Sequence, residues 1–197
     1  MTERNRTASW DSMYKDTDVE RMPWFSEDLD PDLEQELQER NIATGTFLDL
    51  CTGPGTQAIA LSGKGFTVTG TDISESAVEK AKKLSSSVEF KTNDILNSTL
   101  RRKFDYIFDR GCFHVFSPEE RLKYLREVKR MLKRKGLLFL KCFSVKEKGD
   151  KGPYRFSGDE IEEIFSRDFV IESIRDTRYQ GTLKRLPKAL FIVMRKR

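Results

Sequence analysis

From Thr46 onward, short apolar segments alternate with helical patterns, and this alternation limits the possible folds more than any other feature of the chain. The apolar segments are rich in residues that favour strands and cover 46–51, 66–71, 87–91, 104–109 and 136–143. Helical patterns separate them at 55–63, 75–85 and 117–135. Strands and helices that alternate in this way form parallel sheets with right-handed crossovers. We therefore expect an α/β fold built on a parallel sheet.

Capping signals mark where three of the helices begin. Asp30-Pro31 combines an N-cap residue with proline at the first helical position. Ser117-Pro118-Glu119-Glu120 and Ser157-Gly158-Asp159-Glu160 both match the capping box, and Gly136 is expected to stop the helix that starts at the first of them. Three helix starts and one helix stop are thus predicted from local chemistry alone.

The last two apolar segments, 169–174 and 189–194, have no helical pattern between them. Parallel strands need a crossover connection, whereas a loop of about a dozen residues can join antiparallel strands. We predict seven strands, with the last one reversed.

Composition limits the class of protein. The 197 residues are enough for one domain with a full core, and 37% hydrophobic with 35% charged residues is typical of a soluble protein. No segment approaches the roughly 20 apolar residues of a membrane helix, and the charged N-terminus has no apolar signal core, so we expect a cytoplasmic protein that does not bind membranes. The net charge of +4 comes from interleaved charges, so no nucleic-acid partner is expected, and the chain is taken as a monomer or dimer.

One stretch, LDLCTGPGTQAIAL at 48–61, reads as a buried strand that turns through Gly-Pro-Gly into a helix. This arrangement is typical of a nucleotide site, and residues 53–58 also match the dinucleotide pattern G-x-G-x-x-A. Cys51 occupies a position where such loops often have glycine. We expect an extended backbone there, because a side chain makes a positive φ costly.

Acidic residues end the neighbouring strands, namely Asp49, Asp72, Asp94 and Asp109. In an open parallel sheet these residues meet at one edge, where ligands bind. A pyrophosphate cofactor would need a positive edge instead. The acids favour S-adenosylmethionine, which carries an amine and a sulfonium and has no phosphate.

Four segments, DLCTGPGT, TGTDIS, KTNDIL and FDYIFDRGCFHVF, resemble those of class I methyltransferases that use S-adenosylmethionine. The segment SWDSMYKDTDVERMPWF and Asp109-Arg110-Gly111 narrow the resemblance to the branch with thiopurine S-methyltransferase and the tellurite-resistance methyltransferases. The resemblance covers about residues 10–197. It implies a Rossmann-like three-layer sandwich in a single domain 1–197, with an N-terminal lid and helix at 1–45 and a core at 46–197.

The resemblance also implies roles for individual residues. Asp72 would accept from the ribose hydroxyls, Asp94 from the adenine amine, and Trp24 would close over the cofactor. Arg110 would meet the methionine carboxylate or an acidic acceptor. The full predicted cofactor set is Trp24, Asp49, Cys51, Gly53, Gly55, Asp72, Ile73, Asn93, Asp94, Ile95, Asp109 and Arg110.

The acceptor site is less defined by the sequence. His114 is a candidate general base, with Asp109 beside it, although a histidine that merely packs its loop is the alternative. Three arginines on the loops at this edge suit a small anionic acceptor if they converge. The predicted acceptor-binding residues are Trp10, Arg110, Phe113, His114, Tyr154, Arg155 and Arg178.

The three cysteines lie in unrelated contexts without a C-x-x-C pair, which argues against a disulfide framework or a structural zinc site. We expect Cys51, Cys112 and Cys142 to pack as small apolar side chains and predict no metal site. Their place near strand ends leaves open a metalloid methyltransferase, since thiolates bind soft atoms.

Transfer of a methyl group from a sulfonium to a small-molecule thiol, hydroxyl or anion by in-line displacement is the function that these features favour. Positioning supplies much of the acceleration in such a reaction, so no single side chain is obligatory. The segment Asp109-Arg110-Gly111-Cys112 lacks the Pro-Pro motif of enzymes that methylate base amines. Two other functions stay open: an NAD(P)-dependent oxidoreductase, from the G-x-G-x-x-A loop, and a cofactor-binding module without turnover.

Overall fold

Eight strands form one sheet in the computed structural model, which describes residues 3–149 and 152–197. Their order is β3-β2-β1-β4-β5-β8-β7, with β6 beside β5. The bounds are β1 Thr46–Leu50, β2 Thr67–Asp72, β3 Glu89–Thr92, β4 Phe104–Arg110, β5 Leu132–Ser144, β6 Arg155–Phe156, β7 Phe169–Arg178 and β8 Lys188–Lys196. The β1 to β5 pairings are parallel, and β8 runs antiparallel to both β5 and β7. The prediction of a mostly parallel sheet with its last strand reversed is confirmed, and the two-residue β6 is an additional strand.

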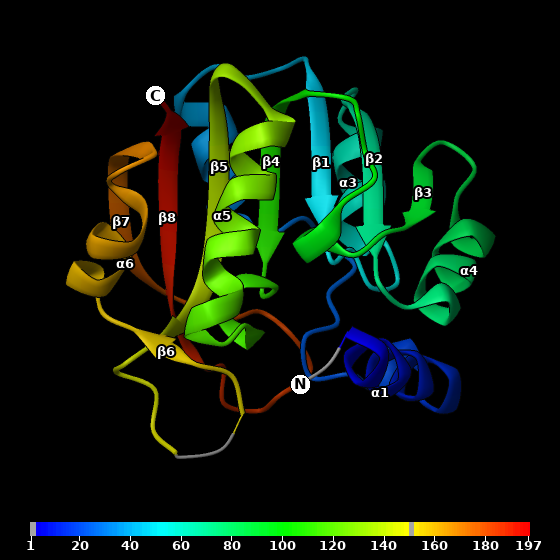
Figure 1. Ribbon diagram of the computed structural model, residues 1–197. Helices are drawn as coiled ribbons and strands as arrows, with labels where there is room; N and C mark the ends of the chain where they lie inside the picture. The colour runs from blue at the N-terminus through cyan, green and yellow to red at the C-terminus, as the bar shows by residue number, and fades with distance from the viewer. Residues whose placement is uncertain (1–2, 150–151) are drawn as a thin grey trace.

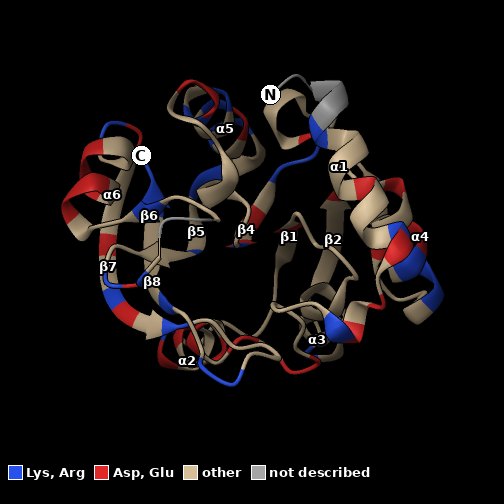
Figure 2. Ribbon diagram, turned by 90° about the horizontal axis from the view of Figure 1, so that it is seen from below, with Lys and Arg blue, Asp and Glu red and all other residues tan. Residues whose placement is uncertain are grey.

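Helices cover both faces of this sheet, which gives three layers (Figures 1 and 2). Helices α2 (Pro31–Glu39), α3 (Thr56–Gly63) and α4 (Glu75–Leu84) pack on one face. Helices α5 (Pro118–Met131) and α6 (Gly158–Phe165) pack on the other. None of the helices in residues 3–149 and 152–197 is long and apolar enough to cross a membrane.

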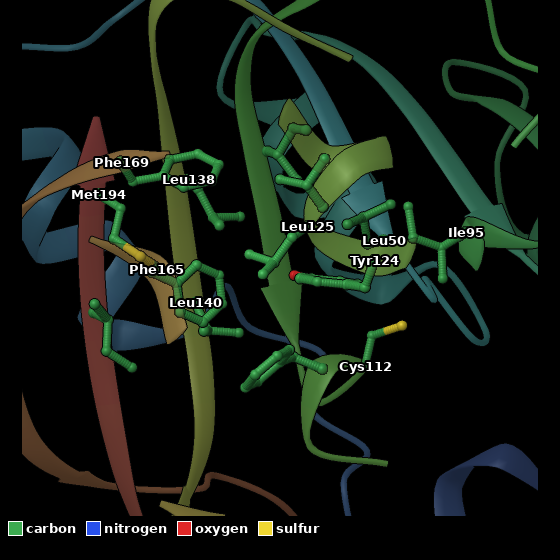
Figure 3. Close-up of a cluster of buried hydrophobic side chains, with 14 of the residues drawn as sticks. Leu50, Ile95, Cys112, Tyr124, Leu125, Leu138, Leu140, Phe165, Phe169 and Met194 are labelled. Atoms are coloured by element: carbon green, nitrogen blue, oxygen red, sulfur yellow. The ribbon is translucent and has the colours of Figure 1, made fainter. Parts of the chain in front are cut away.

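Two hydrophobic clusters hold the layers together, because successive side chains of a strand face opposite sides of the sheet. Phe139 of β5 packs with the α2 and α3 side, whereas the next residue, Leu140, packs with Tyr124 and Phe165 on the other side (Figure 3). All of these side chains are buried. Burying each stabilises the fold by roughly 1.5–3 kcal/mol.

The boundary between α5 and β5 differs from the prediction. The helix ends at Met131 instead of residue 135, and β5 begins at Leu132, which pairs with Phe104 of β4. Leu132 continues the apolar stripe of the helix in the sequence, and Gly136 is a strong stop signal. Because Leu132 pairs with β4, the strand begins four residues before the position that these local signals indicate.

The first helix, α1 (Glu3–Asp16), was not predicted. It lies below the carboxyl ends of β2 and β3, beside α4 (Figure 1). Its aromatic residues Trp10 and Tyr14 pack with Met22, Trp24 and Ala77 in a small separate cluster. A helix with so few apolar residues shows no clear 3.6-residue periodicity, which is why the sequence did not indicate it.

Candidate active site at the carboxyl edge of the sheet

A cavity of about 330 Å³ opens at the carboxyl edge of the sheet, below α1. Loops that follow β1, β2, β3 and β4 line it, together with the loop between β7 and β8. This is the edge at which the acids that end the strands were expected to meet. The predicted residues that line the cavity are Trp10, Trp24, Asp49, Cys51, Gly53, Asp72, Ile73, Asn93, Asp94, Ile95, Arg110 and His114.

The loop after β1 passes close under the lid. Asp72 accepts a hydrogen bond from the Gly53 N–H (2.9 Å) and another from the Ser74 N–H (2.9 Å), which fixes its carboxylate between two loops. Gly53 has φ +52, and a Cβ added to it would lie 2.5 Å from the Tyr14 hydroxyl. Only glycine therefore fits at this position.

Cys51 also adopts a left-handed backbone, with φ +51, so the expectation of an extended conformation there is wrong. The turn from β1 into α3 requires three left-handed residues, Cys51, Gly53 and Gly55. For a residue with a side chain this conformation costs roughly 1–2 kcal/mol. The geometry of the turn between β1 and α3 therefore outweighs the conformational cost of a left-handed backbone at Cys51.

Asp49 and Asp72 are buried carboxyls, and within residues 3–149 and 152–197 neither forms a salt bridge with a cationic side chain. Burial raises the pKa of Asp49 to about 7 and that of Asp72 to about 6. The hydrogen-bond donor to the Asp49 carboxylate is the hydroxyl of Thr52, at 2.5 Å. A cationic, hydroxyl-bearing ligand would supply the missing compensation, so these residues fit S-adenosylmethionine.

The lid is attached to the site through Arg6 of α1. Its guanidinium pairs with Asp94 (2.6 Å) and Glu120 (2.8 Å) and is almost completely buried. The other oxygen of Asp94 accepts from the Leu96 N–H (2.9 Å), at the start of η2 (Ile95–Asn97). Both oxygens of Asp94 are thus engaged within the protein.

Arg110 holds the segment between α1 and α2 against the sheet. Its guanidinium donates to Asp30 (2.8 Å), to the Trp24 carbonyl (2.9 Å) and to the Gln180 carbonyl (2.6 Å). All three nitrogens are therefore engaged by the protein. The predicted contact of Arg110 with a carboxylate of cofactor or acceptor stays a prediction, although the side chain lies at the cavity wall.

Lys141 completes this network from the middle of β5. It is fully buried and pairs with Asp30 (2.7 Å) and Asp32 (2.6 Å). The network joins α2, β4, β5 and the loop after β7, so it positions several walls of the cavity at once.

His114 lies at the cavity wall in η3 (Phe113–Val115). Its Nδ1 accepts a hydrogen bond from the Phe143 N–H (3.1 Å), so the proton of the neutral ring is on Nε2. Burial lowers the pKa of His114 to about 3. The ring is neutral near pH 7, and its remaining nitrogen is a donor.

Asp109 shapes the loop that carries His114 but is not part of the cavity wall. Its carboxylate accepts from the backbone N–H groups of Gly111 (3.1 Å) and Cys112 (2.7 Å) and from the Tyr124 hydroxyl (2.6 Å). Burial raises its pKa to about 6. This placement gives Asp109 a positioning role, and its predicted catalytic and cofactor roles stay untested.

The structure does not bring every predicted residue to the cavity. Phe113 is buried and packs against Tyr124, Phe156 and Phe165. Gly55 lies beside Phe90, away from the wall. The other residues outside the wall are Tyr154, Arg155 and Arg178, so the three arginines do not converge there. Arg155 and Arg178 were expected on loops, but the first lies on β6 and the second at the end of β7, outside the lining of the cavity.

The cysteines are the clearest correction. Cys51 and Cys112 form a disulfide, while Cys142 is free and buried, so the expectation of unpaired cysteines is wrong for two of the three. The two partners are 61 residues apart, but β1 and β4 are neighbours in the sheet and each cysteine follows the end of one of them. Within residues 3–149 and 152–197, no group of three or more His, Cys, Asp or Glu side chains is arranged to hold a metal ion.

Comparison with known proteins agrees with this geometry. Residues 47–136 match the family model described as a methyltransferase domain. An uncharacterised methyltransferase of Schizosaccharomyces pombe is 31% identical over 102 residues, which cover 49% of this chain and 70% of the relative. The chain belongs to the methyltransferase family. Its cofactor is S-adenosylmethionine, so the dinucleotide interpretation of the loop at 53–58 is set aside.

Two further relatives of this methyltransferase extend the likeness. A probable thiol methyltransferase of Arabidopsis thaliana is 26% identical over 166 residues, which cover 81% of this chain and 72% of the relative. A solved S-adenosylmethionine-dependent methyltransferase from Anabaena variabilis has a TM-score of 0.80 at 22% identity and covers 98% of this chain and 96% of its own. The structural likeness supports the fold over the whole chain.

Several residues that organise the methyltransferase site escaped the sequence analysis, namely Arg6, Tyr14, Asp30, Lys141 and Tyr179. One signal was available. Lys141 stands alone in the apolar segment LLFLKCFS, and a charged residue inside a buried strand needs partners. The partners themselves lie more than 100 residues away, and no local pattern identifies them.

Proposed function

We propose that this methyltransferase transfers the methyl group to a small thiol that binds as its thiolate. The observation that carries the proposal is the state of His114. Its Nδ1 is occupied by the Phe143 N–H and its pKa is held at about 3, so it is not a base for an acceptor near pH 7. An acceptor that ionises without help suits such a site, and thiols do so more readily than alcohols.

The cofactor supplies a methyl group on a sulfonium, which an anion displaces in line. Asp49 is suited to compensate the cationic amino-acid part, because burial raises the pKa of its carboxyl to about 7 despite the Thr52 hydroxyl and the charge of Arg110. Asp72 lies where it can accept from hydroxyl groups, and Ile73 and Ile95 offer apolar contacts to a flat ring. Trp10, Tyr14 and Trp24 of the lid exclude water above them.

The acceptor side of the cavity is apolar. Val115, Phe116, Phe143, Leu183 and Pro187 line it, next to His114. The Nε2–H of His114 is a donor that can stabilise a thiolate without taking up its proton. The name of the Arabidopsis thaliana relative, a probable thiol methyltransferase, is consistent with this acceptor class.

The proposal also covers the location, the domain organisation and the partners of the enzyme. We place the enzyme in the cytoplasm, as a single domain over residues 1–197 that is a monomer or dimer. It acts on a small molecule and needs neither nucleic acid nor a membrane. The interleaved charges and the enclosed cavity support this assignment.

The test compares thiols with their oxygen analogues. 2-Mercaptoethanol and thiophenol are offered with S-adenosylmethionine beside ethylene glycol and phenol, and methylated products are measured by mass spectrometry. We expect only the thiols to be methylated near pH 7. With S-adenosylmethionine kept saturating at every pH, the pH dependence of kcat/KM for the thiol should follow the pKa of each thiol, because the ring of His114, the candidate base at the cavity wall, does not titrate in this range.

Two outcomes would contradict the proposal. One is methylation of phenol at a rate equal to that of thiophenol. The other is a pH profile that stays the same for thiols of different pKa, since a common profile would indicate a base in the protein.

A further inference from the structure

The Cys51–Cys112 disulfide lies in the wall of the cavity itself. Both cysteines line the cavity, Cys51 from the cofactor loop between β1 and α3 and Cys112 from the loop between β4 and η3. Cys51 is partly exposed, whereas Cys112 is only 2% exposed. Cys51 is therefore the more accessible residue of the pair.

The two loops are positioned without the disulfide. Leu50 of β1 pairs directly with Asp109 of β4, immediately before the two cysteine loops. The cofactor loop is held by its own bond from the Thr52 N–H to the Thr71 carbonyl (2.8 Å). The other loop is held by the Asp109 carboxylate, which accepts from the Cys112 N–H (2.7 Å). The disulfide is therefore not needed to hold the two loops together, since the sheet and these hydrogen bonds already do so. Its place in the cavity wall leaves it open to reaction with a molecule bound in the cavity.

The third cysteine, Cys142, differs from this pair in both its exposure and its reactivity. Cys142 is fully buried in β5, and burial raises the pKa of its thiol. A thiol in this state is a poor nucleophile. Exchange chemistry at the site is therefore confined to Cys51 and Cys112.

We propose that Cys51–Cys112 is a redox-active disulfide that exchanges with the small thiols admitted by the cavity. A thiolate attacks Sγ of Cys51, the bond to Cys112 breaks, and Cys112 leaves as a thiolate that takes up a proton. A second thiolate attacks the small-molecule sulfur of the mixed disulfide, Cys51 leaves as a thiolate that takes up a proton, and the small disulfide is released. The balance is two thiols oxidised to one small disulfide, and one protein disulfide reduced to two cysteine thiols.

This inference rests on the proposed function for the presence of a thiol in the cavity, and it adds a second reaction of the same molecule. Reduction removes the covalent tie between the cofactor loop and the loop of His114. The thiol that accepts the methyl group is thus also the reductant that releases these two loops from each other.

The test measures exchange without methyl transfer. Oxidised protein is mixed with 2-mercaptoethanol in the absence of denaturant, quenched with iodoacetamide, and mapped by peptide mass spectrometry. We expect alkylation of Cys51 and Cys112 but not of Cys142. Saturating S-adenosylhomocysteine, which binds in the same cavity, should slow the reaction about tenfold or more by restricting access.

Two variants sharpen the result. In Cys112→Ser, the small disulfide cystamine should form a mixed disulfide at Cys51. Cys142→Ala is the matched control and should exchange at the rate of the unaltered protein. A pair that opens only in denaturant, or at a rate indifferent to S-adenosylhomocysteine, would overturn the inference.

The two proposals fail separately, because methylation of the same 2-mercaptoethanol is measured in a parallel reaction. Methylation with an unreactive disulfide would leave the proposed function intact and remove this inference. Exchange without methylation would contradict the choice of acceptor and leave the reactivity of the pair established.

Discussion

At this site, burial shifts the pKa values of single residues more than neighbouring charges do. Burial is the largest cause of the raised pKa of Asp49 and Asp72 and the cause of the lowered pKa of His114. The effect favours the neutral form in each case. The acids therefore become good partners for a cation only when the pH rises above their pKa values, whereas His114 stays neutral over the whole physiological range.

Cofactor binding should therefore depend on pH. The Asp49 carboxyl, with a pKa of about 7, is mostly protonated near pH 5.5 and mostly ionised near pH 7.5, and the ionised form attracts the cationic cofactor. We expect calorimetry to show about tenfold tighter binding of S-adenosylmethionine at the higher pH.

Two controls isolate the contribution of Asp49. Asp49→Asn should flatten the pH dependence. 5′-Methylthioadenosine, which lacks the cationic groups, should show a weaker dependence than the full cofactor. A pH-independent affinity in the unaltered protein would show that Asp49 does not face the cation.

Most helices and strands could be predicted from the sequence, but helix α1 could not. The crossover helices and the parallel strands were predicted because their period and capping signals are local, as at Ser157 before α6. Helix α1 was missed because its aromatic residues pack on the lid cluster and not on the main core. Among site residues, the acids at the ends of β1, β2 and β3 line the cavity as predicted, whereas Asp109 at the end of β4 does not. Arg155 on β6 and Arg178 at the end of β7 also lie outside the lining, and where these strand ends lie relative to the cavity has no sequence signature.

The attachment of α1 can be tested through Arg6. Its ion pairs with Asp94 and Glu120 are nearly buried, so Arg6→Ala should let the helix open more often. We expect amide hydrogen exchange in α1 to become about tenfold faster or more, while exchange in the central strands stays the same.

Arg21 provides the matched control for Arg6. Its side chain is 82% exposed and pairs with Asp18, whose side chain is 73% exposed, and an ion pair so exposed contributes little. Arg21→Ala should leave exchange in α1 unaltered. Equal exchange in the Arg6 variant would mean that the Arg6 ion pairs do not hold α1, and that the aromatic packing and the hydrogen bonds that Asp11 accepts from Ser74 and Ser76 suffice.

At the scale of the whole molecule, one buried ionic network connects parts that are far apart in the chain. Lys141 and Arg110 both bind Asp30, and through it they tie the lid segment to the centre of the sheet. The sequence indicated the lysine by its unusual place in an apolar strand. It did not indicate the partners, because the pairing depends on how α2 docks over the carboxyl edge.

Removing Lys141 should destabilise the whole fold. Lys141→Met leaves Asp32 without its buried cation, and the loss of one member of such a pair lowers the free energy of unfolding by about 3–5 kcal/mol. Urea denaturation measures this change. Lys146→Met is the control, because its pair with Asp176 is more than half exposed and contributes roughly 0–1 kcal/mol. Equal midpoints for the two variants would contradict the assignment.

The reversed last strand also determines how this enzyme can be remodelled. The hairpin loop at 179–187 supplies Tyr179, Leu183 and Pro187 to the cavity, yet no crossover helix depends on it. Gly181 is the fixed point of the loop, since a Cβ there would overlap the Pro23 carbonyl. Thr182 donates to the Met22 and Pro23 carbonyls, and Pro187 accepts from the Tyr179 N–H, so the part of the loop open to replacement is 183–186. Longer or shorter segments there would change the acceptor side of the cavity while the parallel strands that support the cofactor stay as they are.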